Sequence, residues 1–308
     1  MAFEFETKRK FALLAIDGLY ANLPELEFQL PDGTWVMPSL PRVADLSIWK
    51  QWIGSLRADS LQCANLVLVA QKASHNPMVL DEAHNQLANH LSGLFYSLHL
   101  RSGMERVGEN EPDLLCGSRL VGDPIIRQMR RLSSFHQTMG YRRTPMTREW
   151  LEEASTLYSG TAIMASVPGY FMRVFRGLNV LFRGMKETGQ ERMHHFVRAL
   201  EALILPGIGN TRRQFVHRCQ TFALACDAAR TALAEAFDMR SDTEHLQDWN
   251  RAVLTHPVSV REHVCWQRTR QIEHLAPGYS GDVMIFVGVV SSGKSMASRD
   301  HTCQQRKN

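Results

Sequence analysis

Apolar residues recur along most of this chain at intervals of three and four, the period of an amphipathic helix. The clearest example is residues 80–100, where one helical face collects Leu80, His84, Leu87, Leu91, Phe95 and Leu98. The same spacing predicts helices over 6–21, 45–73, 123–139, 147–158 and 168–187, with a loop over 101–118. Residues 31–34, Pro-Asp-Gly-Thr, separate two short apolar segments and predict a hairpin. We therefore expect an all-α helical bundle with at most one small N-terminal hairpin.

The last third of the chain predicts a four-helix unit. One helix ends before Pro206, and a long one follows with an apolar stripe from Phe215 to Phe237. Two more are expected near 241–253 and 257–275. The predicted domains are a helical region of unknown role over 1–145, a helical domain over 146–277 and a tail over 278–308.

Charge is distributed unevenly. The 308 residues are 44% hydrophobic and 21% charged, with a net charge of +4, which is ordinary for a globular protein. Residues 171–230, however, hold ten basic residues and only four acidic ones. Such a segment suits a polyanionic partner. The alternative is a solvated helix surface with no partner.

Neither a targeting segment nor a metal framework is indicated. Acidic residues precede the basic ones at the N-terminus, unlike a signal peptide, and no apolar run approaches the length that spans a bilayer. The six cysteines form no Cys-x-x-Cys pair, and Cys219 and Cys226 fall on an apolar helical stripe as expected core thiols. We expect a cytoplasmic protein with no membrane contact, no metal and no cofactor.

Residues 240–245, Arg-Ser-Asp-Thr-Glu-His, combine a permanent cation with an imidazole. Ser241 and Glu244 have the spacing of a capping box, which predicts a helix starting at Ser241. Arg240 and His245 would then face each other at a helix N-terminus, where backbone N–H groups and the helix dipole favour an anion. The pattern predicts a phosphate-sized site with an acid–base group beside it.

Together with the preceding helices, this segment resembles a HEPN domain, particularly the Apea-like group. The resemblance rests on Arg198-Ala-Leu-Glu-Ala-Leu, Phe215-Val-His-Arg and the Arg240-to-His245 spacing, whose hallmark is Arg, a polar residue, three variable positions and His. It covers roughly residues 187–275. Glu244 and Leu246 depart from the family, which usually has an aliphatic residue before the His and a small one after it.

The resemblance implies a HEPN-like four-helix unit that forms a homodimer and acts as a metal-independent endoribonuclease in anti-phage, abortive-infection or toxin–antitoxin defence. Arg240 would hold the scissile phosphate, His245 would be the acid–base group and Ser241 would fill the polar position. RNA-binding side chains are expected at Arg212, Arg213 and Arg218. An antitoxin or sensor protein is a further possible partner. The alternative from another class is a catalytically inert RNA-binding or scaffold module.

Three other motifs are set aside. Residues 288–295 match the P-loop pattern Gly-x4-Gly-Lys-Ser, but only 13 residues follow, too few for a P-loop domain. A truncated fragment of a larger P-loop NTPase stays an alternative. Residues 81–84 spell the helicase box Asp-Glu-Ala-His, yet His84 falls on an apolar helical face and is expected to be a core histidine. Glu191-x-x-His194 has no second copy and predicts no di-iron site.

Overall fold

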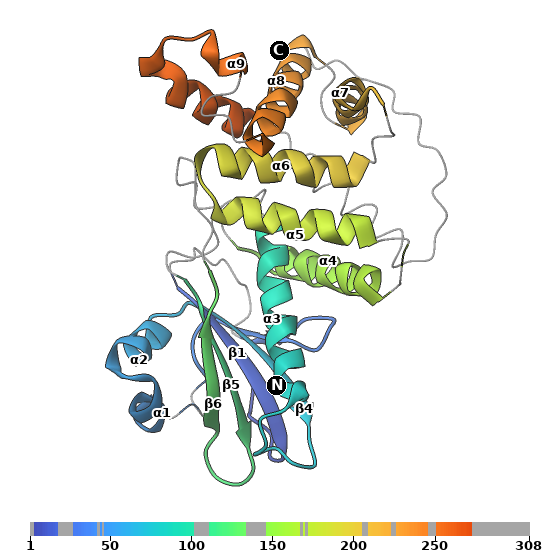
Figure 1. Ribbon diagram of the computed structural model, residues 1–308. Helices are drawn as coiled ribbons and strands as arrows, with labels where there is room; N and C mark the ends of the chain where they lie inside the picture. Colours follow the sequence, from blue (N-terminus) through green and yellow to red (C-terminus); the bar gives the residue numbers. More distant parts are fainter. Residues whose placement is uncertain are drawn as a thin grey trace.

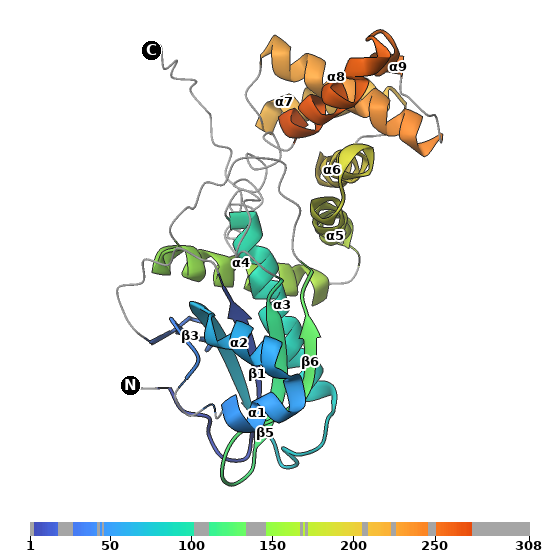
Figure 2. The same ribbon diagram turned by 90° about the vertical axis from the view of Figure 1, so that its left-hand side faces the viewer.

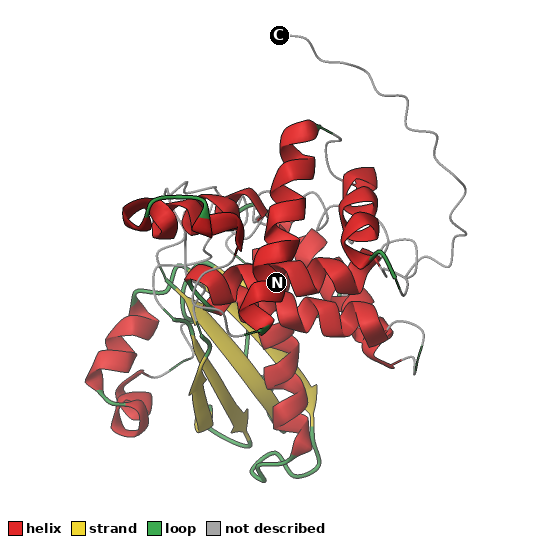
Figure 3. Ribbon diagram, turned by 45° about the horizontal axis from the view of Figure 1, so that its top comes forward, coloured by secondary structure: helices red, strands yellow, loops and turns green. Residues whose placement is uncertain are grey.

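The chain combines an antiparallel β-sheet with a helical unit, so the predicted all-α class is wrong (Figures 1 and 3). The computed structural model describes residues 3–17, 27–41, 44, 46–101, 111–133, 146–166, 169, 172–204, 209–222, 226–245 and 251–272. Within them the sheet occupies the N-terminal part and the helical unit begins at Arg148. The predicted domain boundary at 145–146 stays a prediction, because Met146 and Leu151 belong to the core that α3 forms with the sheet.

The sheet has six strands in the order β2-β3-β4-β1-β5-β6, every neighbouring pair antiparallel. In chain order the strands are β1 Arg9–Ile16, β2 Phe28–Gln29, β3 Trp35–Met37, β4 Leu66–Ala73, β5 Asp113–Arg119 and β6 Ile125–Arg131. The short β2–β3 pair is the hairpin that the sequence predicts around residues 31–34. The register shifts opposite Cys116 and Gly117, where Arg127 of β6 has no partner on β5, and marks a bulge in β6.

The central strands explain the wrong helix predictions. β1 pairs with β4 on one side and β5 on the other, and seven of its eight residues are buried. A strand covered on both faces carries a continuous apolar run, which periodicity does not distinguish from a buried helix segment. For this reason the helix predicted over 6–21 is wrong where β1 lies. The helix predicted over 123–139 is wrong over residues 125–131, which form the edge strand β6, and β5 lies in the predicted loop at 101–118. The predicted helical stretch 45–73 contains two helices and then β4.

Helices cover both faces of the sheet. Helix α3, Glu82–Arg101, packs its predicted apolar face on one side, where Leu91, Phe95 and Leu98 are fully buried. On the other side lie α1, Leu46–Ile53, and α2, Ser55–Gln62 (Figure 2). Trp49 and Leu61 of these helices pack in one core with residues of the sheet. The far end of α3 reaches the helical unit and links the two parts through a shared core.

The helical unit stacks beyond the end of α3 (Figure 1). Its helices are α4 Arg148–Ser166, α5 Met172–Lys186, α6 Gly189–Ile204, α7 Thr211–Phe222, α8 Asp227–Glu244 and α9 Arg251–Leu254, followed by a helix over 258–272. The long helix predicted through residues 215–237 is two helices. Cys226 is not the predicted core thiol, because it is exposed and its sulfur accepts the Ala229 N–H at the start of α8.

Two glycines bring α5 and α6 into close contact. A Cβ atom at Gly177 would lie 2.7 Å from the Cβ of Ala202, and one at Gly184 would lie 2.9 Å from the Cβ of His195. The glycines are seven residues apart, so both lie on one face of α5. This contact sets the rotation of α5 about its axis and therefore decides which of its side chains remain exposed.

Candidate functional site

The predicted phosphate site, Arg240 to His245, lies at the C-terminal end of a helix and not at a helix start. Arg240 and Ser241 lie inside α8, whose N-cap is Cys226 and whose C-cap is His245. The Ser241 carbonyl accepts the His245 N–H at 3.2 Å, an ordinary bond at a helix end. The predicted capping box is therefore wrong, because α8 starts fourteen residues before Ser241. The motif occupies the C-terminal end of a helix, where the dipole is negative and does not attract an anion.

Arg240 is bound by two carboxylates. Its Nη1 donates to Glu244 Oε2 at 2.7 Å, and its Nη2 donates to Glu201 Oε2 on α6. The guanidinium also lies 5.2 Å from the centre of the Phe237 ring. Its Nε is buried and has no hydrogen-bond partner among the described residues. The cation is thus held inside the helical unit, with a net negative charge in its immediate surroundings.

The two carboxylates differ in how firmly they are held. The Glu201 side chain is 12% exposed and the Glu244 side chain 38%. An Arg followed by Glu four residues later is the weaker order of such a pair, worth about 0.3 kcal/mol on an exposed helix. Glu244 also lies in the last turn of α8, beside the negative end of the dipole. Glu201 is therefore the fixed partner of Arg240, and Glu244 is the weakly held one.

Ser241 and His245, the other two predicted site residues, do not form one acid–base site with Arg240. His245 is exposed at the end of α8, and Ser241 is half-buried. Among the described residues, neither is seen in a hydrogen bond from its side chain to Arg240. Glu201 is the contact that the motif alone does not indicate. It lies within the Arg198-to-Leu203 segment quoted for the resemblance, but nothing in the sequence pairs it with Arg240.

Two of the three arginines predicted to bind RNA are engaged within the protein. Arg212 donates two 2.8 Å bonds to the Asp238 carboxylate, and this pairing raises the pKa of the guanidinium. Arg218 donates to the Ile204 carbonyl at 2.9 Å and so caps the C-terminal end of α6. Arg213 is exposed on the first turn of α7. The structure therefore favours Arg213 among the three for external contact.

A second basic surface lies on α5. This helix carries four basic residues and no acidic one, and three of them are exposed along its length. We name Arg173, Arg176 and Arg183 the basic face of α5. None of the described carboxylates forms an ion pair with Arg176 or Arg183. Arg173 donates to the backbone carbonyl of Glu201 at 3.2 Å, so the basic face adjoins the partner of Arg240.

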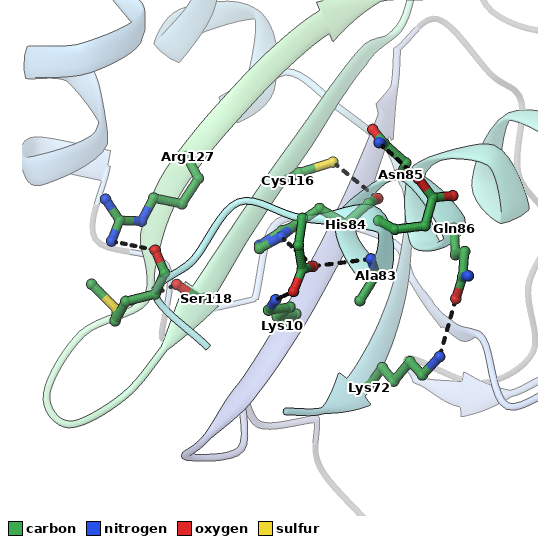
Figure 4. A network of polar contacts seen from close by, with 12 residues as sticks. Lys10, Lys72, Ala83, His84, Asn85, Gln86, Cys116, Ser118 and Arg127 are labelled. Carbon is green, nitrogen blue, oxygen red and sulfur yellow. Dashed lines mark hydrogen bonds and ion pairs between the residues drawn. The ribbon is translucent and has the colours of Figure 1, made fainter. Parts of the chain in front are cut away.

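A buried polar network joins the sheet to the start of α3 (Figure 4). Lys10 on β1 is fully buried, and its ammonium donates to Asp81, whose side chain is 43% exposed. The other Asp81 oxygen accepts the Ala83 N–H at 3.0 Å and so caps α3. The hydrogen bond from Lys10 lowers the pKa of Asp81. Sequence reasoning missed Lys10, because it is a single basic residue in a segment predicted as helix.

The apparent helicase box belongs to this network. His84 is fully buried, as expected for a core histidine, and its Nε2 lies 3.2 Å from the Gly117 carbonyl. Burial lowers the pKa of His84, and the nearby Lys10 charge lowers it further. The neutral ring links α3 to β5 and has a structural role. The P-loop-like segment 288–295 lies outside the described residues.

Comparisons with known proteins identify no relative: no family model, curated protein or solved structure matches the chain. The HEPN resemblance therefore stays a prediction from the sequence. No helix within the described ranges is long and apolar enough to cross a membrane. Among the residues that the structure describes, no group of three or more His, Cys, Asp or Glu side chains could hold a metal ion.

Proposed function

We propose that the protein binds RNA and that the basic face of α5 contacts the phosphate backbone. The observation that carries the proposal is a helix with three exposed arginines and no acidic residue, which packs against α6 through Gly177 and Gly184. The guanidinium group matches two phosphate oxygens at once, which makes arginine a preferred phosphate ligand. A fixed rigid helix also lowers the entropy lost on binding.

The dimensions of this face support a polymeric rather than a small ligand. Arg173 and Arg183 are ten residues apart, so their backbone positions are separated by about 15 Å along α5. That length exceeds a single phosphate group and fits several consecutive nucleotides, which rise about 3.4 Å each in a stacked strand. The absence of any acid on α5 means that the phosphates of a bound strand meet no repelling charge on this helix.

Neutralising Arg176 and Arg183 tests the proposal. In Arg176→Gln/Arg183→Gln we expect weaker binding of a fluorescein-labelled single-stranded RNA, followed by anisotropy across a range of NaCl concentrations. The slope of log Kd against log salt should fall by about 1.4, because each lost phosphate contact removes about 0.7. The matched control is Lys50→Gln/Arg57→Gln, which removes two exposed cations from α1 and α2. Equal slopes in both doubles would refute a specific role for α5.

RNA cleavage without a metal is a second candidate function, supported by one arrangement. His245 is exposed at the end of α8, five residues after the arginine that the resemblance assigns to the scissile phosphate, so its ring is accessible to RNA. A histidine titrates near neutral pH and can move a proton from a 2′-hydroxyl. Dimerisation, which the resemblance implies, would add a second His245 and is part of this proposal.

His245→Ala separates binding from cleavage. Total RNA and growth are followed together after induced expression of the wild type and of the variant. Under the cleavage hypothesis, RNA fragments and growth arrest occur with the wild type alone, while the affinity for labelled RNA in vitro changes by less than about twofold. Intact RNA in both strains, with retained affinity, would leave a binding module without nuclease activity. Cleavage by the variant would exclude His245 as the acid–base group.

A further inference from the structure

Strand β6 is an edge of the sheet, and among the described residues only β5 pairs with it (Figure 2). Just past the end of β6, the Leu132 N–H donates to the Pro112 carbonyl on the β5 side at 3.0 Å. Backbone groups alternate in direction along a strand, so Met129 and Arg131 turn their N–H and C=O groups away from β5. These groups have the arrangement that pairs with a further extended chain.

The same edge carries an excess of positive charge. β6 contains three arginines and no acidic residue. Arg127 is exposed and donates to a backbone carbonyl at 2.9 Å, whereas Arg131 donates to the buried Asp113 carboxylate at 3.4 Å. From α2, the exposed Arg57 donates to the sulfur of Met129 at 3.1 Å. Apart from the pair with Asp113, no described carboxylate forms an ion pair with these cations, so the edge is net positive.

We propose that β6 is the docking edge for a partner protein that presents an extended acidic segment, which pairs with β6 as an added strand. The backbone of such a segment satisfies both the N–H and the C=O groups of the edge, and its carboxylates meet the arginines.

Two other occupants fit this edge less well. A second copy of this chain, paired through its own β6, would place arginines opposite arginines, which destabilises a strand pair. RNA offers phosphates that accept hydrogen bonds from the N–H groups but cannot donate to the C=O groups. A protein partner is therefore favoured, and this inference does not depend on RNA binding by α5.

Peptides that differ in charge or in backbone donors test the docking. The probe is a fluorescein-labelled peptide of alternating glutamate and valine, as long as the seven residues of β6. Its anisotropy is followed during titration with the full-length protein. We expect binding, and binding about tenfold weaker when the backbone nitrogens of the peptide are methylated, because methylation removes the hydrogen-bond donors and keeps the charge. A lysine–valine peptide of the same length should not bind.

Two variants of β6 separate backbone pairing from charge. Met129→Pro removes an outward N–H and no bond to β5, a position where edge strands accept proline, and should weaken peptide binding at least about fivefold. Arg127→Gln/Arg130→Gln should weaken binding and reduce its salt dependence. The control Lys72→Gln/Arg230→Gln removes two exposed cations from β4 and α8 and should bind like the wild type.

The outcomes distinguish the possible occupants of the edge. Binding that requires the unmethylated backbone and is weakened in both β6 variants would support the proposal. No binding of the acidic peptide, or equal affinity for its methylated form, would overturn it. Urea unfolding checks that Met129→Pro is folded, and the methylated peptide gives the same test on the wild type if it is not. Weaker binding of labelled RNA by the arginine variant, without any peptide binding, would assign the edge to nucleic acid and reject a protein partner.

Discussion

Replacing Gly117 by alanine should destabilise the protein by about 3 kcal/mol or more, because the new methyl group has no space. An ideal Cβ at this position would lie 2.3 Å from the Ile125 carbonyl oxygen and 2.4 Å from Cζ of Phe11. The first is a backbone atom of the paired strand β6, and the second belongs to a fully buried ring. The carbonyl oxygen cannot move without disturbing the pairing of β5 with β6, and the Phe11 ring is enclosed by the core.

Urea unfolding at equilibrium measures this loss of stability. The control is Gly122→Ala in the same β5–β6 hairpin, where no atom lies within 4 Å of the added Cβ. Gly122 has a φ of +79°, so this control should lose only about 1 kcal/mol from backbone strain. Similar stabilities for the two variants would mean that strand β6 does not approach Gly117 as closely as the structure indicates.

Removing the charge of Asp81 should strongly destabilise the fold, whereas removing its partner Lys10 should not. Asp81→Asn keeps an oxygen that can cap α3 but leaves the fully buried Lys10 ammonium without a counter-ion. In Lys10→Met, an apolar side chain of similar length replaces the ammonium, and the partly exposed Asp81 remains solvated. We expect Lys10→Met to stay within about 1 kcal/mol of the wild type.

The double variant shows whether the two effects share one cause. Lys10→Met/Asp81→Asn should regain most of the stability that Asp81→Asn loses, as a thermodynamic cycle from urea unfolding would measure. Additive losses would show that Asp81 acts mainly through its contact with Ala83. A second variant, Lys10→Leu, provides the same test if methionine packs poorly beside His84.

The pH dependence of stability should follow the same pair. Lys10 lowers the pKa of Asp81, so more protons bind to Asp81 in the unfolded chain than in the folded one as the pH falls through 3.8. The contribution of this pair is therefore present above that value and is lost below it. Lys10→Met should flatten the acid limb of a stability–pH profile. An unchanged profile would contradict the ion pair.

The local sequence pattern was sufficient to predict a helix or turn that buries only one of its sides. The apolar stripe at residues 80–100 predicted α3, and the same spacing predicted helices that overlap α4, α5 and α6. Pro31 to Thr34 predicted the one short hairpin correctly, because the turn residues impose their own backbone geometry. These elements depend on contacts between residues close in the sequence or on one continuous interface.

The sheet could not be predicted in the same way, because its strands find their partners far along the chain. β1 is central only because β4 and β5, about 55 and 105 residues away, pair with its two edges. Both faces of β1 are then covered, and the alternation that would reveal a strand is absent. A single buried lysine within this strand gave no signal, since its partner Asp81 belongs to another element.

For the candidate site, the sequence by itself determined the chemical groups: an arginine and a histidine five residues apart, and a segment with an excess of positive charge. Tertiary structure decided how those groups are used. It placed Arg240 near the C-terminal end of α8, paired it with Glu201 from α6, and turned the arginines of α5 outward. The physical reason is that side-chain spacing is local, whereas burial, counter-ions and the rotation of a helix depend on packing between distant segments.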